Sequence, residues 1–509
     1  MSVIFAAHQV LNLACKKSFK KFYQQTDQLE FVQRNKLKSL IGEPNITYES
    51  FIERFPLTRY IDWKDKVESS RVEGVNLLNH SKIIRFQPTS GSSEVLKFIP
   101  YTQQFLDELD QAIGLWLTSL YNRYPQLKSS THYWSISWLP ESQRKLTTAY
   151  NMNDDSALLS FTKRFLTKIT QAVPADIALA ENAEDAMFAT AVYLARDANL
   201  GMISVWSPTF ALQLLEIIQL NQKEIVQVLA TGKWTRENLA YLKIRPSKQR
   251  SRILESLNLE DPKSWRKLWK KLCLISSWDT ASAQHWAKIL KTKVADVQFE
   301  GKGLWATEGV VTIPLDDQYP LMYQAHFYEF LDLTNHQVYP SWKLEKDQLV
   351  SPVITTGSGL KRYIIDDELR VESFYQGIPC FKFLGRKMTV DLVGEKIDQT
   401  VALALIEHFK QGGFLPISLL GIEQTDSKPY YVLLAQGEVG AMPSNEELDQ
   451  YLQQNFHYEL ARNLGQLDQA RIMCVDDAWA EYKFIAMENG MIEGNIKPEP
   501  LKKMKFLKK

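Results

Sequence analysis

Apolar and aromatic residues recur at helical spacing over most of residues 1–60, most clearly in FKKFYQQTDQLEFVQRNKLKSLI at 19–41. Shorter stretches with the same period follow at 48–70, and the pattern predicts an amphipathic helix at 105–124. Between them, KIIRFQPTSGSSEVLKFIPYT at 82–102 predicts two apolar strands joined by a turn of small polar residues. The N-terminal region is therefore expected to be mainly helical, with one strand–turn–strand unit inside it.

From about residue 130 to 300, short apolar strands alternate with long helices. HYWSISWLP at 132–140 predicts a buried strand. GMISVWSPTFALQLLEII at 201–218 predicts a strand followed by a helix, and WKKLCLISSWDTASAQHWAKIL at 269–290 repeats that order. Because strands that alternate with helices form parallel sheets covered on both faces, we expect an α/β fold.

Beyond residue 300 the pattern changes to apolar strands at hairpin intervals, and beyond about 387 a new α+β unit begins. In that unit the pattern predicts a helix at 400–411, a strand at 430–436, a helix at 445–465 and a strand at 470–476. We place the domain boundary within FLGRK at 383–387. No low-complexity linker separates the two parts of the sequence, so we expect a compact hinge there.

The composition is that of an ordinary globular protein. Of the 509 residues, 45% are apolar and 23% are charged, and the formal net charge is +1. A charge this close to zero gives no electrostatic reason to expect nucleic acid or a membrane as a partner. No run approaches the ~20 apolar residues that cross a bilayer, and the first residues lack the basic stretch of a signal peptide. We expect a monomer that binds neither nucleic acid nor membrane.

Cysteine and histidine are sparse. The four cysteines, Cys15, Cys273, Cys380 and Cys474, lie far apart without a C-x-x-C pair, and no H-E-x-x-H motif occurs. We therefore expect neither disulfides nor a transition metal held by the protein. This usage fits the reducing cytosol, so we expect a cytoplasmic location.

Four polar stretches interrupt the apolar pattern and could carry chemistry. They are TSGSSEVLK at 89–97, ATEG at 306–309, RYIIDDELRV at 362–371 and GNIKPEP at 494–500. Taken singly, they are typical of a loop, a helix cap, a solvated strand edge and an exposed lysine. Their order along the chain is more informative than any one of them.

That order resembles the adenylate-forming superfamily, and within it the auxin-responsive (Gretchen Hagen) family of acyl acid amido synthetases. TSGSSEVLKFIPYT is similar to the phosphate loop of that family with its Lys-x-x-Pro-x-Thr extension. LKRYIIDDELRVESFYQGIPCFKFLGRK follows the family's Leu-x-Arg-Tyr run up to its Arg-Arg/Lys end. HFYEFLDL resembles its Phe-Glu-Phe segment, and NFHYELARNLGQL resembles a helix of its C-terminal domain. The likeness covers nearly the whole chain.

The resemblance implies an α/β architecture of two lobes. A large N-terminal domain, residues 1–385, would have mixed and parallel sheets covered by helices and would bind the nucleotide and the acyl group. A small α+β domain, residues 386–509, would move between the two half-reactions about the hinge.

The resemblance assigns the first polar stretch to the phosphates of ATP. Its hydroxyl groups would donate hydrogen bonds to phosphate oxygens, and its glycine would let backbone N–H groups approach. The lysine would add positive charge or simply begin the next strand. The residues concerned are Thr89, Ser90, Gly91, Ser92, Ser93 and Lys97.

The second polar stretch would serve the reacting phosphate and the base. Thr307 would contact the α-phosphate, and Glu308 would act as a catalytic residue by holding Mg²⁺. Trp305 would stack on adenine, because Leu304 stands where many relatives carry a tyrosine.

The remaining assignments concern the ribose and the developing charge. Asp367 would accept hydrogen bonds from both ribose hydroxyls, and Arg386, at the hinge, would reach the ribose or a phosphate. Lys497 would be catalytic, because a positioned cation stabilises the charge that develops as a carboxylate attacks the α-phosphate. The chain departs from the family pattern at Glu94, within the phosphate loop, and at Asp366, where a glycine is usual.

With ATP and Mg²⁺ as cofactors, the implied reaction activates a carboxylic acid as an acyl-adenylate and transfers the acyl group to the amine of an amino acid. An acyl-CoA or other thioester-forming ligase, and a non-catalytic member that binds an acyl group or a partner, stay open as alternatives. Several aromatic residues could line an apolar acyl slot or belong to the core: Tyr133, Trp134, Trp138, Trp206 and Phe210.

Overall fold

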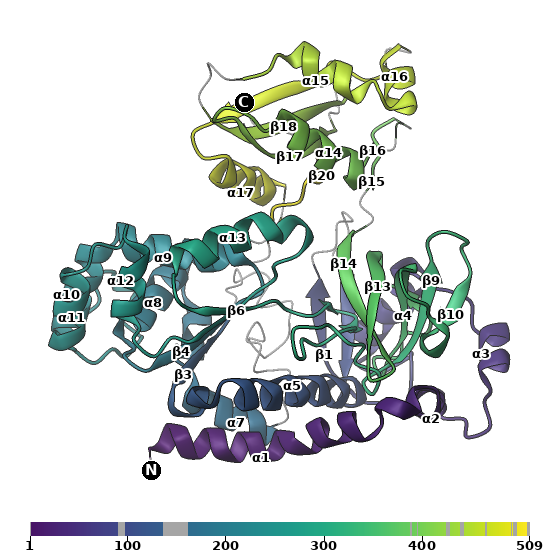
Figure 1. Ribbon diagram of the computed structural model, residues 1–509, viewed down its shortest axis with the longest axis horizontal. Coiled ribbons are helices and arrows are strands. Elements are labelled where there is room, and N and C mark those ends of the chain that lie inside the picture. The colour runs from purple at the N-terminus through teal and green to yellow at the C-terminus, as the bar shows by residue number, and fades with distance from the viewer. Residues whose placement is uncertain are drawn as a thin grey trace. The chain divides into compact units, whose positions relative to one another are not determined.

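Figure 1 shows the computed structural model of the chain, which describes residues 2–89, 97–135, 161–386, 389–393, 395, 397–423, 428–437, 442–463, 466–489, 491 and 496–505. The described chain divides into two compact units. The first comprises Met1–Thr89 and Leu96–Leu384, and the second is built on Gly385–Lys509.

The first unit contains a four-stranded parallel sheet in the order β3-β4-β5-β6. Its strands are β3 (Thr131–Trp134), β4 (Leu200–Ser204), β5 (Leu274–Ser276) and β6 (Gln298–Glu300). Successive residues point to opposite faces, as strand geometry requires, and both faces are buried. One core therefore takes Tyr133, Ile203 and Ile275, and the other takes Trp134, Met202 and Leu274. The parallel α/β sheet predicted from the strand–helix alternation is confirmed.

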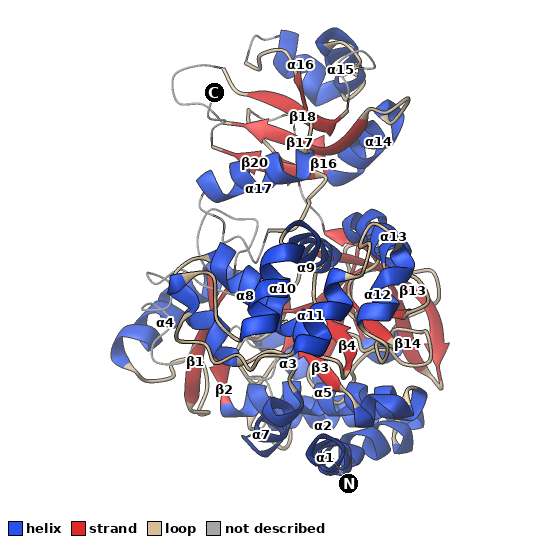
Figure 2. Cartoon of the chain, turned by 90° about the vertical axis from the view of Figure 1, so that its left-hand side faces the viewer, coloured by secondary structure: helices blue, strands red, loops and turns tan. Residues whose placement is uncertain are grey.

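Helices cover both faces of this sheet. One face packs on a helical layer that Figure 2 shows in front of β3 and β4, formed by α8 (Ala183–Arg196), α9 (Pro208–Leu220), α10 (Gln222–Thr231), α11 (Lys248–Glu255), α12 (Pro262–Leu268) and α13 (Gln284–Lys293). The other face shares a core with α1 (Val3–Gln24) and α5 (Gln103–Arg123), and α7 (Phe161–Thr170) packs against α1. The side chain of Thr102 begins α5 by accepting a hydrogen bond from the backbone of Phe105, so this helix starts where the preceding strand ends.

A second sheet of the first unit has six strands, in the order β10-β9-β11-β13-β14 with β12 paired to β11. The strands are β9 (Phe327–Asp332), β10 (Val338–Pro340), β11 (Leu349–Thr355), β12 (Tyr363–Ile364), β13 (Asp367–Tyr375) and β14 (Ile378–Arg386). It shares the core of α1 and α5, and α2 (Leu29–Ile41) packs against β9. The helix α3 (Tyr48–Arg54) follows α2 in the sequence and contributes Phe51 to a small core that also contains Phe327 of β9.

Two hairpins of the same unit carry candidate site residues. The first pairs β1 (Ile83–Thr89) with β2 (Lys97–Thr102), so that Thr89 lies opposite Lys97, and β2 packs on α4 (Tyr60–Glu73). The second pairs β7 (Trp305–Ala306) with β8 (Gly309–Val310). Thr307 and Glu308 form its turn, so the ATEG stretch is the tip of a short hairpin and not the end of a long strand.

The second unit is a four-stranded sheet, in the order β19-β18-β17-β20, with a core on each face. Its strands are β17 (Leu415–Ile422), β18 (Tyr430–Gln436), β19 (Arg471–Val475) and β20 (Leu501–Met504), and a small ladder joins β15 (Thr389–Val390) to β16 (Ile397–Asp398). One face packs on α14 (Gln399–Phe409), α15 (Asn445–Leu452) and α16 (Phe456–Asn463), and the other on α17 (Ala478–Glu488). Alternate residues of β18 enter the two cores, Tyr431 and Leu433 on one side and Val432 and Leu434 on the other.

The prediction of one helix at 445–465 is wrong, because two helices occupy that stretch. α15 ends at Leu452, and the side chain of Asn455 accepts hydrogen bonds from the backbone of His457 and Tyr458 at 3.2 and 3.4 Å. An asparagine that binds the first backbone N–H groups of a helix favours a new start at that point. Within the described chain, no helix combines the length and apolar character that a membrane span needs.

Candidate functional site

The loop end of the β1–β2 hairpin lies against α4. Lys97 begins β2 with its Nζ 5.8 Å from the ring centroid of Tyr60, and the backbone N–H of Phe98 donates to the Tyr60 hydroxyl at 2.9 Å. Thr89 ends β1, and the loop residues Ser90, Gly91, Ser92 and Ser93 lie outside the described residues, as does Glu94. The geometry thus fixes the two strands that would carry a phosphate loop.

The Thr307–Glu308 turn is held by two tyrosines from other strands. The hydroxyl of Tyr101, on β2, donates to the backbone oxygen of Thr307 at 3.1 Å. The hydroxyl of Tyr363, on β12, donates to Oε1 of Glu308 at 3.2 Å, and Glu308 is buried. These two bonds join the hairpin turn to the base of the β1–β2 hairpin and to the antiparallel sheet.

Arg85 adds a positive charge to this cluster. Its guanidinium carbon lies 4.7 Å from the ring centroid of Tyr101, and its side chain is buried. Burial raises the pKa of Tyr101, while the nearby charge of Arg85 opposes that shift and the charge of Glu308 adds to it. A cation and a carboxylate therefore act on the pKa of the same tyrosine in opposite directions.

The two aspartates at the start of β13 have different environments. Asp366 is partly exposed and forms an ion pair with Arg59, at the start of α4. Asp367, the first residue of β13, is buried and lies shortly after Tyr363 of β12 in the sequence. Arg59 thus neutralises the extra charge of Asp366, and Asp367 is the buried member of the pair.

The Leu-x-Arg-Tyr and Phe-Glu-Phe segments meet in a buried ion pair. Arg362 donates to both carboxylate oxygens of Glu329, at 3.0 and 2.9 Å, and also to the backbone oxygen of Phe55 at 2.8 Å. Burial raises the pKa of Glu329, and the hydrogen bonds and charge of Arg362 oppose that shift. A two-pronged pair of this kind fixes geometry, so these motif residues hold the chain just ahead of Tyr363.

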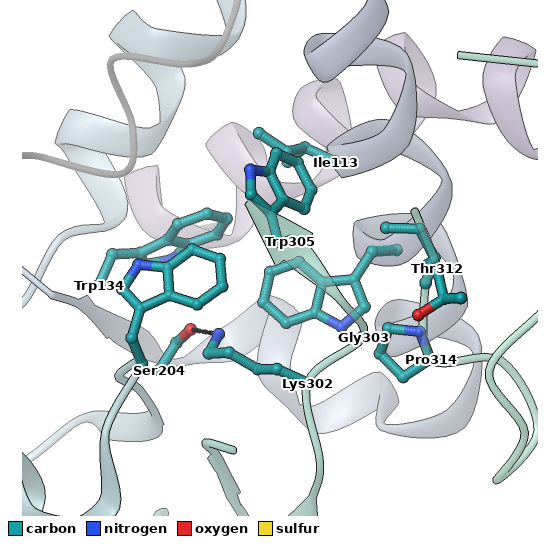
Figure 3. Close-up of a pocket in the computed structure, with 11 residues that line it drawn as sticks. Ile113, Trp134, Ser204, Lys302, Gly303, Trp305, Thr312 and Pro314 are labelled. Atoms are coloured by element: carbon teal, nitrogen blue, oxygen red, sulfur yellow. Dashed lines mark hydrogen bonds between the residues drawn. The ribbon is translucent and has the colours of Figure 1, made fainter. Parts of the chain in front are cut away.

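Trp305 lines a pocket at the carboxyl ends of the parallel strands, where α/β sheets usually bind ligands (Figure 3). The space measures about 500 Å³, a volume that includes solvent at its open mouth. Its walls are mainly apolar and include four tryptophans: Ile113, Trp116, Trp134, Ser204, Trp206, Lys302, Gly303, Trp305, Thr312, Ile313 and Pro314. The rings of Trp116 and Trp134 meet edge to face at 5.6 Å between centroids.

Of the aromatic residues that the sequence left open between core and slot, Trp134 and Trp206 line this pocket. Tyr133 is fully buried in the helical core, and Phe210 packs against that core. Trp138 lies outside the described residues.

In the second unit, Lys497 is partly exposed and lies just before β20. The surrounding segment is anchored to its own unit, since the hydroxyl of Ser418 donates to the backbone oxygen of Glu499 at 2.6 Å. Arg386 is the last residue of β14, and its side chain lies outside the described residues. The roles expected of Lys497 and Arg386 stay predictions.

Comparisons with known proteins identify the family of the chain. The sequence matches the GH3 family N-terminal domain over residues 15–299 and the GH3 family central domain over residues 319–386. The chain belongs to the GH3 family. This confirms the family resemblance inferred from the order of the polar stretches.

The curated relatives of this GH3 chain are distant. It is 23% identical over 386 residues to the indole-3-acetic acid-amido synthetase GH3.15 of Arabidopsis thaliana, covering 67% of this chain and 63% of the relative. It is also 23% identical over 274 residues to GH3.3 of the same plant, covering 47% of this chain and 45% of the relative. The alignments thus span about half to two thirds of these relatives.

A solved structure, AtGH3.15 acyl acid amido synthetase in complex with 2,4-DB, is similar over 96% of this chain and 94% of its own. The TM-score is 0.76 at 17% sequence identity. A second structure, GH3.15 acyl acid amido synthetase, has a TM-score of 0.71, also at 17% identity. The two-lobed α/β fold expected for the GH3 chain is therefore confirmed.

Among the residues that the structure describes, Glu308 is the carboxylate that the sequence assigned to a magnesium ion. The residues that the structure describes contain no group of three or more His, Cys, Asp or Glu that could hold a metal by itself. Glu308 and the phosphate oxygens of a bound nucleotide would have to share the ion, and Mg²⁺ is usually held in this way. The donor set of this GH3 chain fits that requirement.

Sequence reasoning missed Tyr101, Tyr363 and Arg85, although the first two stand inside the segments that resemble the GH3 family. A tyrosine or arginine in an apolar strand is as typical of a core as of a site, so the pattern gave no sign of these contacts. Lys302 and Trp116 were missed for a related reason, because their meeting depends on packing between α5 and the segment after β6.

Proposed function

We propose that this GH3 family member is an ATP-dependent acyl acid amido synthetase. In the first step a carboxylate oxygen of the acid attacks the α-phosphorus of ATP, the bond to the β-phosphate breaks, and pyrophosphate leaves. In the second step the amine of an amino acid attacks the acyl carbon, AMP leaves with the bonding electrons, and the amine loses a proton. The products are an amide, AMP and pyrophosphate.

One observation carries the proposal. The Thr307–Glu308 turn is tied by Tyr101 to the hairpin of the phosphate loop and by Tyr363 to the strand that leads to Asp367. The turn assigned to the α-phosphate and the metal is thus hydrogen-bonded to the strand that follows the phosphate loop and to the strand that precedes Asp367. Such an arrangement supports a single nucleotide site.

In this proposal Thr307 contacts the α-phosphate, Glu308 holds Mg²⁺, and Asp367 accepts from the ribose hydroxyls. Lys97, with the loop that precedes it, attracts the β- and γ-phosphates. When bound, Mg²⁺ supplies charge that neutralises the phosphate oxygens. The tyrosines keep the carboxylate of Glu308 and the Thr307 backbone in place before the nucleotide arrives.

The pocket beside Trp305 receives the acyl acid, so Trp305 lines the acyl pocket in this scheme in place of the adenine stacking expected from the sequence. Its apolar, aromatic walls suit the body of an organic acid, and Trp305 stands two residues from Thr307, where the carboxylate must react. Lys497 and Arg386 supply positive charge to the transition state in this scheme, and the second unit would move between the steps. The four cysteines are free thiols, which supports a reducing, cytoplasmic setting.

The test is pyrophosphate exchange with Mg-ATP and a panel of carboxylic acids. Exchange with at least one acid is expected from the wild type, and Glu308→Ala and Lys497→Ala should reduce it by 100-fold or more, on the order of a few kcal/mol. Glu345→Ala, at an exposed glutamate on a different turn, serves as the matched control and should leave exchange unchanged.

Product analysis separates the alternatives. Amide formation with amino acids supports the synthetase, whereas a thioester formed only with coenzyme A would replace it with a thioester-forming ligase. If no acid supports exchange and calorimetry detects no binding of Mg-ATP, the protein is a binding member of the family without catalysis.

A further inference from the structure

A positively charged side chain lies in the wall of the aromatic pocket. The Nζ of Lys302 donates to Oγ of Ser204 at 2.9 Å and lies over two indole rings, 4.7 Å from the centroid of Trp206 and 5.0 Å from that of Trp116. Contacts of this kind stabilise an ammonium group where water is scarce. The pocket therefore combines flat apolar walls with one fixed cation.

The backbone on either side holds Lys302 in place. A Cβ atom at Gly303 would lie 2.1 Å from the backbone oxygen of Thr312, so only glycine allows the two segments to approach this closely. The backbone N–H of Leu304 donates to the hydroxyl of Thr312 at 2.7 Å, and that of Val311 donates to the Leu304 oxygen at 2.9 Å. The stem of Lys302 starts from a rigid point, and Ser204, the last residue of β4, fixes its tip.

Lys302 and Trp305 both border Trp206, whose ring centroid lies 4.7 Å from Nζ of Lys302 and 6.2 Å from the ring centroid of Trp305. Figure 3 shows Lys302 next to Ser204 on one side and Trp305 on the other, with an indole ring between them. Trp305 leads into Thr307 and Glu308, where the acid would meet the nucleotide. A molecule whose carboxylate faces Thr307 would thus turn its opposite end toward the ammonium.

We propose that Lys302 makes this pocket selective for aromatic acids that carry a second oxygen group, a ring hydroxyl or a second carboxylate, at the end far from the reacting carboxylate. The indole faces hold the ring, and the ammonium donates to the distal oxygen. The inference rests on the proposed function, because it takes the reacting carboxylate to face Thr307.

The physical reason is the cost of covering a charge. A hydrocarbon end that enters the pocket removes water from the ammonium and offers no acceptor in return. A hydroxyl or carboxylate replaces that water with a charge-assisted hydrogen bond. Such a bond corresponds to a gain in affinity on the order of 10- to 100-fold.

The experiment is calorimetric binding to the full chain without ATP. The probes are phenylacetate, 4-hydroxyphenylacetate, 4-carboxyphenylacetate and hexanoate. For the wild type we expect the two substituted acids to bind about 10-fold or more tightly than phenylacetate, and hexanoate to bind least. Lys302→Met, which keeps the length of the stem, should erase the advantage of the substituted acids and change phenylacetate affinity by less than about 2-fold.

Lys291→Met is the matched control. Lys291 also lies over an aromatic ring, 4.3 Å from the centroid of Phe299, but it is exposed and does not line the pocket. This variant should bind all four acids as the wild type does. If Lys302→Met does not fold, Ser204→Ala provides the second variant, since it removes the acceptor that orients the ammonium and should reduce the same discrimination.

Three results would overturn the inference: equal binding of substituted and unsubstituted acids by the wild type, a uniform loss for all aromatic acids in Lys302→Met, or no binding of any probe. Pyrophosphate exchange, measured separately, tests the proposed function. Selective binding that depends on Lys302 without exchange would remove the synthetase proposal and leave the assignment of the pocket intact. Exchange with alkyl acids alone, unchanged in Lys302→Met, would do the reverse.

Discussion

At the scale of single residues, the candidate site depends on side chains that position the residues assigned to the chemistry. Tyr363 binds Glu308, Tyr101 binds Thr307, and Arg59 neutralises Asp366 so that Asp367 lies beside a compensated charge. The chemistry assigned to Glu308 and Asp367 thus rests on neighbours that do no chemistry themselves. Their removal should change binding in a graded way without abolishing the fold.

Tyr363→Phe tests this dependence. The variant keeps the ring and loses the 3.2 Å hydrogen bond to Glu308, a loss of about 1 kcal/mol. We expect the Mg²⁺ concentration at half-maximal pyrophosphate exchange to rise roughly 5-fold. Tyr241→Phe, which removes a 3.2 Å bond to the backbone oxygen of Asp176 at an exposed position, is the control. An unchanged Mg²⁺ requirement in Tyr363→Phe would contradict the role given to this hydroxyl.

Thr307, Glu308 and Asp367 could be predicted from the sequence because they belong to short polar motifs whose order along the chain is recognisable. The sequence did not reveal Tyr101, Tyr363, Arg85 or Lys302, because each acts through a contact between segments far apart in the chain. A side chain that crosses between strands leaves no local pattern.

At the scale of elements, strong periodicity decided what could be predicted. The strand–helix pairs at 201–218 and 269–290 were found because a buried strand and an amphipathic helix differ in period. The break between α15 and α16 was missed, since the apolar spacing continues through it and only the Asn455 cap interrupts the backbone. Two-residue strands such as β7 and β8 are too short to show any period at all.

A buried polar chain links three elements around the Thr307–Glu308 hairpin. His326 directly precedes β9. Its Nδ1 contacts Glu108 of α5 at 2.8 Å, and its Nε2 accepts a hydrogen bond from the backbone of Val310 at 3.1 Å. Because Nε2 accepts, Nδ1 carries the proton and donates to Glu108. The same carboxylate oxygen accepts from the backbone of Gly357 at 2.9 Å.

His326→Phe should separate this network from simple packing. The new ring could keep the stacking that His326 makes with Phe105, at 5.6 Å between centroids. It would leave the Val310 N–H without its acceptor and Glu108 without one of its donors, while Glu108 keeps the Gly357 N–H. We expect a loss of about 3 kcal/mol in the free energy of unfolding, measured in urea. Adding Glu108→Leu should recover part of that loss, because removing both partners costs less than removing one. Additive losses in the double variant would show that the two groups act independently.

Two histidines tie α1 to β3 and should make the fold sensitive to acid. The rings of His8 and His132 lie 4.4 Å apart, and His8 also contacts the Tyr121 hydroxyl at 2.7 Å. Burial lowers the pKa of His8 to about 4, with the Ser130 backbone bond opposing the shift. Burial, with the charge of His8 adding to it, lowers the pKa of His132 to about 3.

The sign of the effect follows from the two states. Above pH 6.5 both histidines are neutral whether the chain is folded or unfolded, and below it the unfolded chain takes up protons that the folded chain excludes. Stability should therefore fall by about 1.4 kcal/mol per pH unit for each histidine between pH 6 and 4. Thermal unfolding followed by circular dichroism across this range tests it. His132→Phe should flatten the curve relative to the wild type, and an equal slope in both proteins would exclude this origin.

At the scale of the whole molecule, the chain builds two units with separate cores. The boundary falls inside β14, between Leu384 and Gly385, and Gly385 has a φ of 151°, which residues with a Cβ rarely adopt. A glycine with this backbone conformation can change its dihedral angles more easily than other residues, and its place at the boundary is in keeping with the proposed movement of the second unit.

Gly385→Ala should cost about 1–3 kcal/mol of stability and reduce amide formation more than pyrophosphate exchange, because only the full cycle needs both positions of the second unit. Gly413→Ala is the control, since Gly413 also has a positive φ, 94°, with open space where a Cβ would stand. It should lose a similar amount of stability and keep the ratio of the two rates. Equal ratios in both variants would speak against a hinge at Gly385.

The buried free thiols can serve as probes of local opening in the folded chain. Burial raises the pKa of both Cys15 and Cys380 to about 11, so at neutral pH an alkylating reagent meets almost no thiolate there. Reagent can reach Cys15, enclosed between α1 and its neighbours, only when that part of the molecule opens. The rate at which a maleimide alkylates Cys15 should report how often the first unit opens locally around this residue. Measuring that rate with and without nucleotide should show how far ligand binding suppresses the opening.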